Sequence, residues 1–154
     1  MMNLTSTAFK EGLTIPAMYT CSGQDNSPPL IWTGLPAHTF CLALICDDPD
    51  APAGTWVHWV IYNIPLEENG LPANVAKTPM LRNGAYQGVN DFGRIGYGGP
   101  CPPKGKAHRY FFKLYALDTR LSLAPGATKQ ALVQATHGHI VAEVQLMGTF
   151  QRHA

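Results

Sequence analysis

Three carboxylates stand where an apolar run of the sequence ends. They are Asp47, Asp48 and Asp50, in the stretch CDDPDAPAGTWVHW that follows FCLALI. His58 comes shortly afterwards among tryptophans, and His108 opens another apolar run. A carboxylate beside an imidazole fixes the ring tautomer and raises its pKa, which leaves the other ring nitrogen to face a ligand. If their strands are neighbours, Asp48, Asp50, His58 and His108 predict a small pocket for phosphate or carboxylate.

Each of these residues also has an ordinary structural explanation. Asp48 and Asp50 are suited to Asx turns before Pro49 and Pro52. His58 could be a core histidine. A metal site is a third alternative because His and Asp are metal ligands, but these four residues lack a characteristic close spacing. We therefore expect no metal and no cofactor, and we assign Asp47 to a turn or to the surface.

The glycine-rich stretch GYGGPC at 96–101 offers further groups to such a pocket. Successive backbone N–H groups in glycine-rich turns form anion-binding nests, so residues 98–101 are candidate donors. Cys101 is also the only candidate nucleophile near the pocket, and it is the basis of an alternative in which the chain is a hydrolase. The dinucleotide-binding, P-loop and common hydrolase motifs are absent from the sequence.

The elements that must position these residues are mainly strands. Runs of apolar, aromatic and β-branched residues predict strands at 39–46, 56–64, 108–118 and 140–152, with a shorter one at 28–36. In the last of the four longer runs, Ile140, Ala142, Val144 and Leu146 alternate with Val141, Glu143, Gln145 and Met147, which is the period of a half-buried strand. One helix is expected at 125–138, between a Pro-Gly turn and Gly138. Many strands with few helices favour a β-sandwich or barrel.

A long irregular segment at 65–107 interrupts this pattern. Such segments are usually functional or disordered. Phe92, Ile95 and Tyr97 offer apolar anchors within it. We expect an ordered loop that helps to build the site.

Composition restricts the remaining possibilities. The 154 residues suit a single domain, 1–154, and the formal net charge of +1 gives no general attraction to nucleic acid or to anionic membranes. No apolar run is long enough to span a membrane, and the start of the chain lacks the features of a signal peptide. The four cysteines form no C-x-x-C pair, so we expect reduced thiols and a cytoplasmic protein. Cys41 and Cys46 should face opposite sides of one strand.

Several motifs together resemble the phosphatidylethanolamine-binding protein family. They are DPDAP at 48–52 followed by His58, GPCPPKGKAHRYFFKLYALD at 99–118, SPPLIWTGLP at 27–36, GVNDFGRIGYGGPCPP at 88–103 and GHIVAEVQLMGTFQR at 138–152. They look like the compact bacterial branch of the family and cover nearly the whole chain. The resemblance implies a mainly β fold, in which two antiparallel sheets pack as a sandwich with a few peripheral helices and a small anion pocket lies at one end of the large sheet.

The resemblance also implies a set of ligand-binding residues. They are Asp48, Asp50, His58, Cys101 through its backbone N–H, Pro102, His108 and Tyr110. It further implies cis peptide bonds before Pro49 and Pro52. Compared with eukaryotic members, we expect the chain to lack an insert that carries a further pocket tyrosine, and also the C-terminal helix that gates their pocket.

By this resemblance, we expect a binding module for phosphate, a phosphorylated headgroup or a carboxylate, which acts without catalysis in a regulatory or inhibitor-like role. A protein partner and a homodimer are further expectations, because bacterial relatives often dimerise. The kinase-regulating and protease-inhibiting roles of eukaryotic branches transfer poorly. The alternatives are the hydrolase with Cys101 near its Asp/His pocket and an interaction scaffold with a vestigial pocket.

Overall fold

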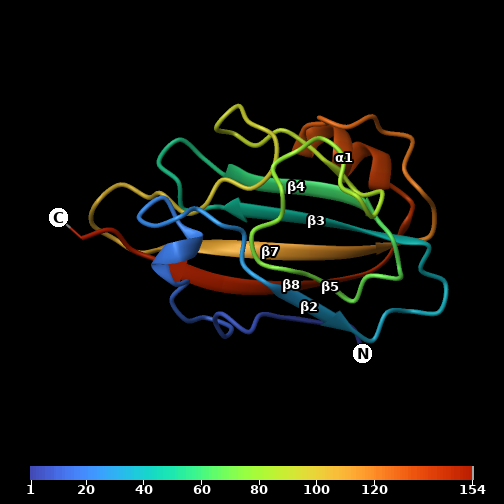
Figure 1. The fold of residues 1–154 in the computed structure, drawn as a ribbon, viewed down its shortest axis with the longest axis horizontal. Helices are drawn as coiled ribbons and strands as arrows, with labels where there is room; N and C mark the ends of the chain where they lie inside the picture. The colour runs from blue at the N-terminus through green and yellow to red at the C-terminus, as the bar shows by residue number, and fades with distance from the viewer. Residues whose placement is uncertain (154) are drawn as a thin grey trace.

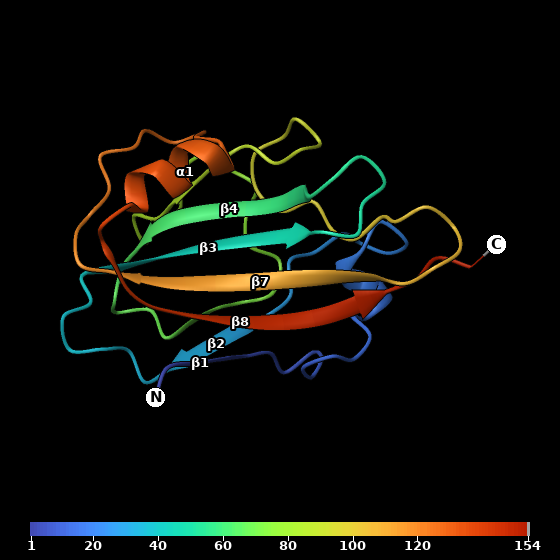
Figure 2. The same cartoon turned by 180° about the vertical axis from the view of Figure 1, so that it is seen from behind.

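The long apolar runs of the sequence form the large sheet of a two-layer sandwich. The computed structural model describes residues 1–153. The large sheet is antiparallel, and Figure 2 shows its long strands side by side. In sheet order its strands are β6 (Tyr86–Gln87), β4 (Trp56–Ile64), β3 (Cys41–Asp48), β7 (His108–Leu117) and β8 (Ile140–Phe150).

A smaller antiparallel sheet forms the second layer. Its strands, in sheet order, are β1 (Asn3–Thr5), β2 (Leu30–Thr33) and β5 (Gly70–Leu71). A short 3₁₀ turn, η1 (Ala17–Tyr19), and one helix, α1 (Lys129–Thr136), complete the regular structure of residues 1–153 (Figure 1). The expected sandwich of two antiparallel sheets with peripheral helical elements is confirmed.

Alternating residues of β3 supply two separate apolar clusters. Leu42, Leu44 and Cys46 face the small sheet and belong to the core between the layers. Cys41 and Ile45 belong to a second cluster on the outer face of the large sheet, where Leu132 of α1 packs. The prediction that Cys41 and Cys46 face opposite sides is therefore confirmed.

The alternation expected for β8 is also confirmed. Ala142, Val144 and Leu146 pack against or within the core between the sheets, whereas the residues between them are exposed or half-buried. One part of its outer edge is covered by residues 12–15, since Gly12 and Ile15 donate N–H groups to carbonyls at 147 and 149.

Helix α1 is shorter than the expected span of 125–138. Thr128 caps its N-terminus by accepting a hydrogen bond from the Ala131 N–H. Gly126 has a φ of +87°, outside the helical region, so the Pro-Gly pair forms a turn before the helix. Gly138, with a φ of +81°, follows its C-terminal end as expected.

The prediction that all four cysteines are reduced is wrong. Cys21 and Cys101 form a disulfide, although 80 positions separate them in the chain. The fold places the loop after η1 against the loop before β7, a proximity that local cysteine spacing cannot indicate. Only Cys41 and Cys46 are free thiols among residues 1–153, and both are buried.

The prediction of cis bonds before Pro49 and Pro52 is also wrong, because no peptide bond in residues 1–153 is cis. The Asp50 N–H donates to Asp48 Oδ1 at 2.7 Å, and the Gly54 N–H donates to the Ala51 carbonyl at 3.1 Å. Each proline thus lies second in a tight turn, a position that the ordinary trans isomer suits.

The segment 65–107 is mostly irregular but extensively bonded to the sandwich. Within this segment, the side chain of Gln87 is fully buried. Its Oε1 accepts a hydrogen bond from Trp59 Nε1 at 2.7 Å, and its Nε2 donates to the carbonyls of Ala76 and Thr78. Tyr97 is buried, as its expected anchoring role requires. No helix of residues 1–153 combines the length and apolarity that crossing a bilayer would require.

Candidate anion-binding site

The inward-facing positions of the central strands continue beyond the apolar core into a polar pocket. Asp48 ends β3 on the same face as Leu44 and Cys46, and His108 and Tyr110 begin β7 on the same face as Phe112. Because β3 and β7 are antiparallel, the end of one strand meets the start of the other. In Figure 1 this end of the sheet lies on the side of the C-terminus.

His58 reaches the pocket through a β-bulge. The pairing of β3 with β4 shifts between Cys46–Trp59 and Asp47–Val57, so His58 is the extra residue. Trp59 lies in the core between the sheets and Val57 in the outer cluster, so the bulge interrupts simple alternation and leaves His58 lining the pocket. Bulges commonly redirect a side chain beside a functional site.

Asp48 holds the ring of His108, as predicted. The Nδ1–H of His108 donates to Asp48 Oδ2 at 2.7 Å, and both side chains are largely buried. The other carboxylate oxygen accepts the Asp50 N–H, so Asp48 also forms the Asx turn that was the alternative explanation. The pairing leaves His108 Nε2 without a protein partner among residues 1–153.

His58 is held by a backbone carbonyl rather than by a carboxylate. Its Nδ1 lies 2.6 Å from the Gly98 carbonyl, which can only accept, so Nδ1 carries a proton and Nε2 remains free. Burial lowers the pKa of His58, and this effect outweighs the Gly98 hydrogen bond and the nearby Asp48 charge. The ring of His58 also makes edge-on contacts with two aromatic rings, which restrain its orientation. Its centroid lies 5.2 Å from that of Tyr110 and 5.4 Å from that of Phe92.

Tyr110 places a hydroxyl without a partner in the same pocket. Its oxygen is buried and has no hydrogen-bond partner within residues 1–153, and the same holds for Nε1 of Trp56. Burial and the neighbouring Asp48 carboxylate raise the pKa of Tyr110, so the phenol keeps its proton. Buried polar groups are nearly always bonded in native proteins, so a ligand in the pocket could accept hydrogen bonds from these two donors.

Asp50 does not orient an imidazole, contrary to the prediction. Its carboxylate accepts from Arg109 through the backbone N–H, Nε and Nη2, at 2.9, 2.9 and 2.8 Å. These hydrogen bonds lower the pKa of Asp50 to about 2. After the turn at Asp48, Asp50 lies outside the pocket lining. There it binds Arg109, the second residue of β7.

The assignment of Asp47 to a turn or to the surface is wrong, because this residue is a buried part of β3. β3 continues through Asp48, so adjacent carboxylates face opposite sides of the sheet. On the outer face Asp47 is buried and lies 2.8 Å from Lys129 Nζ, on the first residue of α1, and 3.2 Å from Lys113 Nζ, on β7. The carboxylate thus links the helix to two strands.

The backbone nest expected at 98–101 is mostly occupied by the protein itself. The Gly98 N–H donates to the His58 carbonyl at 2.9 Å, and the Gly99 N–H donates to Asp25 Oδ1 at 2.8 Å. Pro100 has no N–H. The Cys101 N–H alone has no acceptor within residues 1–153. Asp25 was missed because nothing in its local sequence indicates a partner 74 residues away.

Cys101 lines the pocket but is not a free thiol, which corrects its role as candidate nucleophile. Its sulfur is bonded to that of Cys21, so a hydrolase that attacks through this thiol is excluded in the disulfide form. Pro102 also lines the pocket, as predicted. No cluster of three or more His, Cys, Asp or Glu suited to a metal ion occurs in the part of the chain that the structure describes.

Apolar side chains enclose the polar floor. The cavity has a volume of about 160 Å³. The floor consists of Asp48, His58, His108 and Tyr110, and the wall consists of Ala51, Pro52, Trp56, Phe92, Cys101, Pro102 and Pro103. Trp56 and Phe92, whose rings meet edge-on with centroids 5.5 Å apart, were not predicted to be site residues.

Comparison with known proteins places the whole chain in one group. The family model described as phosphatidylethanolamine-binding protein matches residues 5–151. A UPF0098 protein of Methanothermobacter thermautotrophicus is 53% identical over 151 residues, which are 98% of this chain and 99% of the relative. A UPF0098 protein of Aquifex aeolicus is 46% identical over 99% of this chain and 90% of its own length.

Two crystal structures are similar to the fold of this chain, with a TM-score of 0.90 each. One is a phosphatidylethanolamine-binding protein homolog, CT736, from Chlamydia trachomatis, with 42% identity over 98% of this chain and 97% of its own. The other is YbcL from E. coli, described as a member of the mammalian family, with 33% identity over 97% of this chain and 98% of its own.

Proposed function

The chain belongs to the phosphatidylethanolamine-binding protein family, and from that premise we propose that it binds a small oxyanion, a phosphate or carboxylate group, in the pocket at the end of the large sheet. In this proposal Asp48 orients His108, and His58, His108, Tyr110 and the Cys101 N–H contact the ligand. The protein acts as a regulatory or inhibitor-like binding module rather than as a catalyst.

The observation that carries the proposal is the convergence of open polar groups on one pocket. The Tyr110 hydroxyl on the floor is buried without a partner, the N–H of the exposed Cys101 in the wall has no acceptor in residues 1–153, and both residues line the cavity. Leaving a buried donor unsatisfied costs about 1–3 kcal/mol. An oxyanion, which has several lone pairs, would satisfy both donors at once.

The size of the cavity favours a headgroup over a lipid. Pockets that enclose drug-sized ligands measure roughly 300–1,000 Å³, well above the 160 Å³ found here. A phosphoryl or carboxylate group with a few further atoms fits this space, whereas acyl chains would have to remain outside.

The ring tautomers make binding depend on protonation. In each histidine Nδ1 donates to a protein oxygen, so Nε2 of the neutral ring can only accept. Protonation converts Nε2 into a donor and adds a positive charge beside the ligand. A fully ionised anion should therefore bind together with a proton.

The assay is an NMR titration with inorganic phosphate, phosphorylethanolamine and vesicles that contain phosphatidylethanolamine. We expect saturable shifts at the pocket with the two small ligands, and no greater affinity for vesicles. His58→Ala and His108→Ala should each abolish or strongly weaken binding.

A matched control exists at a distance from the pocket. His139 Nδ1 lies 2.8 Å from Asp118 Oδ1 and is exposed, so His139→Ala removes a similar pair without changing the pocket. Binding that persists in His58→Ala and His108→Ala would refute the site. If no small anion binds, the interaction scaffold becomes the better description, and a pulldown insensitive to pocket variants would support it.

The assembly of the protein and its location in the cell are further proposals. We expect a protein partner or a homodimer, and size-exclusion chromatography with light scattering distinguishes them. The cytoplasmic location expected from the sequence also stays a prediction, testable by cell fractionation. The cytoplasmic location was expected because all four cysteines were predicted to be reduced, and the Cys21–Cys101 disulfide removes that reason. Disulfides are typical of oxidising compartments and of intracellular proteins from hyperthermophiles.

A further inference from the structure

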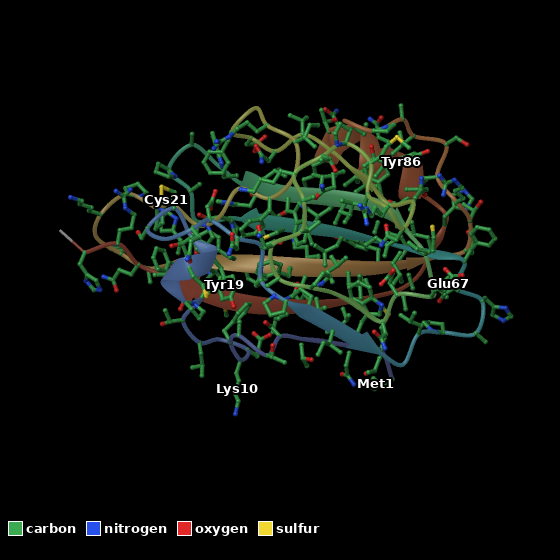
Figure 3. All side chains as sticks on the ribbon, in the orientation of Figure 1. Met1, Lys10, Tyr19, Cys21, Glu67 and Tyr86 are labelled. Carbon is green, nitrogen blue, oxygen red and sulfur yellow. A yellow bond between two sulfur atoms is a disulfide. The ribbon has the colours of Figure 1, made fainter. Side chains whose placement is uncertain are left out.

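The Cys21–Cys101 disulfide lies at the wall of the pocket, on the surface of the protein. Both residues are exposed, and Cys101 contributes to the cavity wall. Figure 3 labels Cys21 beside Tyr19, at the end of the molecule where Figure 1 marks the C-terminus. Because both residues are exposed, a reductant in solution can approach the bond.

We propose that this disulfide is a redox-responsive site, in which thiol–disulfide exchange with a small dithiol or a dithiol protein controls the geometry of the anion pocket. The effect on ligand affinity rests on the proposed function. The exchange reaction itself and its effect on the positions of the pocket residues do not depend on the proposed function.

The contacts around Cys101 show why its position depends on the bond. The residues before it are fixed independently, because the Tyr97 hydroxyl donates to the Tyr19 carbonyl at 2.7 Å and the Gly99 N–H donates to Asp25. The Cys21 N–H also donates to the Pro100 carbonyl at 3.1 Å. The Cys101 N–H makes no hydrogen bond of its own, but it shares a peptide plane with the Pro100 carbonyl, so the hydrogen bond from Cys21 and the disulfide together restrain that group.

The residues after Cys101 are held from another side. Arg152 Nη1 donates to the Pro102 carbonyl at 3.2 Å, and the Gly105 N–H donates to the Arg152 carbonyl at 3.0 Å. Breaking the disulfide should therefore free Cys101 between two anchored segments without unfolding the sheets. The expected result is a local change at the pocket wall.

Arg152 also favours the chemistry of exchange. Its Nη1 lies 3.8 Å from Cys101 Sγ. When a thiolate of the reductant attacks Cys21 Sγ, the protein S–S bond breaks, Cys101 leaves as a thiolate beside the guanidinium, and a mixed disulfide forms at Cys21. The second thiolate of the reductant then displaces Cys21, so that the dithiol is oxidised and the protein receives two electrons.

The first test is native-state reduction with dithiothreitol, followed by alkylation and peptide mapping. We expect Cys21 and Cys101 to be labelled while the fold persists by circular dichroism. Cys41 and Cys46 serve as internal controls, because both are buried on β3 and should stay unlabelled. Labelling that requires global unfolding, with all four cysteines reacting together, would overturn the proposal.

The second test compares the pocket in the two redox states. Reduction, or Cys21→Ser in the presence of reductant, should shift the ring ¹H–¹⁵N signals of His108 and weaken phosphate binding about tenfold, which is the effect of losing one positioned hydrogen bond to an anion. Cys21 does not line the cavity, so its substitution acts only through the lost link. Cys41→Ala, at a buried thiol on the opposite face, should leave the redox response unchanged.

The outcomes separate the two proposals. If phosphate binds neither redox form but the His108 signals shift on reduction, the proposed function fails and the redox coupling stands. If phosphate binds equally to both forms and the His108 signals do not move, the coupling fails and the proposed function stands.

Discussion

Two carboxylates adjacent in the chain, Asp47 and Asp48, have unrelated roles because they face opposite sides of the large sheet. Asp48 holds an imidazole in the pocket, whereas Asp47 binds two lysines on the outer face. A reversal of their roles would need only a shift of one residue in the strand. Asp50, two residues beyond Asp48, lies outside the pocket altogether and restrains Arg109.

The first prediction at this scale concerns Asp48. Asp48→Asn should weaken phosphate binding about tenfold, because His108 Nδ1 loses the charged hydrogen-bond partner that holds the ring toward the ligand. Isothermal titration calorimetry measures the loss. Asp50→Asn is the matched control, since that carboxylate does not line the pocket. Equal losses in the two variants would contradict the assigned role of Asp48.

The second prediction concerns the pH dependence of stability. The folded-state pKa of His58 lies below its ordinary value, so the unfolded chain binds the proton more readily. The free energy of unfolding should therefore fall as pH decreases below about 6.5, the unfolded pKa, and should stop falling below the folded pKa. Urea denaturation between about pH 5 and 8 measures this change.

His58→Gln removes the titrating group and should flatten the pH profile. Adding sulfate, which stays doubly charged across this range, should restore stability at low pH because the anion stabilises the protonated ring. If the free energy of unfolding depends on pH in the same way in His58→Gln and in the unsubstituted protein, a group other than His58 is responsible for the change.

At the scale of elements, α1 is attached to the sheet partly through one buried charge. Asp47→Asn should lower the free energy of unfolding by about 1–3 kcal/mol, because it weakens charge-assisted hydrogen bonds to Lys113 and Lys129. Both lysines are partly exposed and can return to water, so the loss should stay below that of isolating a buried charge. Guanidinium denaturation measures the change.

The same variant tests the separation of the two faces. Phosphate affinity should be unaffected by Asp47→Asn, whereas Asp48→Asn lowers it. A parallel loss of affinity in Asp47→Asn would mean that the position of α1 influences the pocket through the sheet.

The elements were the most predictable part of the structure, because their patterns are local. The aromatic and β-branched run of β4 predicted 56–64, the span observed, and the period of two in β8 predicted its inward face. The alternation through Leu42, Leu44 and Cys46 also contains the information that Asp48 faces inward and Asp47 outward. The bulge at His58 depends on pairing with β3 and cannot be found from β4 alone.

At the scale of the whole molecule, what the sequence did not indicate is the set of contacts between distant segments. The resemblance of motifs located Asp48, His58, Cys101, His108 and Tyr110, all of which line the pocket. The bond from Cys21 to Cys101 and the hydrogen bond from Gly99 to Asp25 join loops about 80 and 74 residues apart. No local spacing specifies such pairs, since they arise only when the two sheets pack together.

The prediction at this scale is the contribution of the disulfide to global stability. Replacing both Cys21 and Cys101 by serine should lower the free energy of unfolding by about 2–4 kcal/mol, because the bond restricts a long loop in the unfolded chain. Denaturant unfolding with and without reductant measures it. A change under about 0.5 kcal/mol would show that the unfolded chain is hardly restricted by the bond.

The pocket joins two parts of the fold that differ in their tolerance of sequence change. Its floor consists of the inward positions of central strands, where a substitution affects both the ligand and the core. Most of its wall belongs to the loops at 51–52, 92 and 101–103, which lie outside the strands. Substitutions in these loops can therefore change ligand preference at a small cost in stability, so that relatives can share one floor and diverge in the ligands that they select.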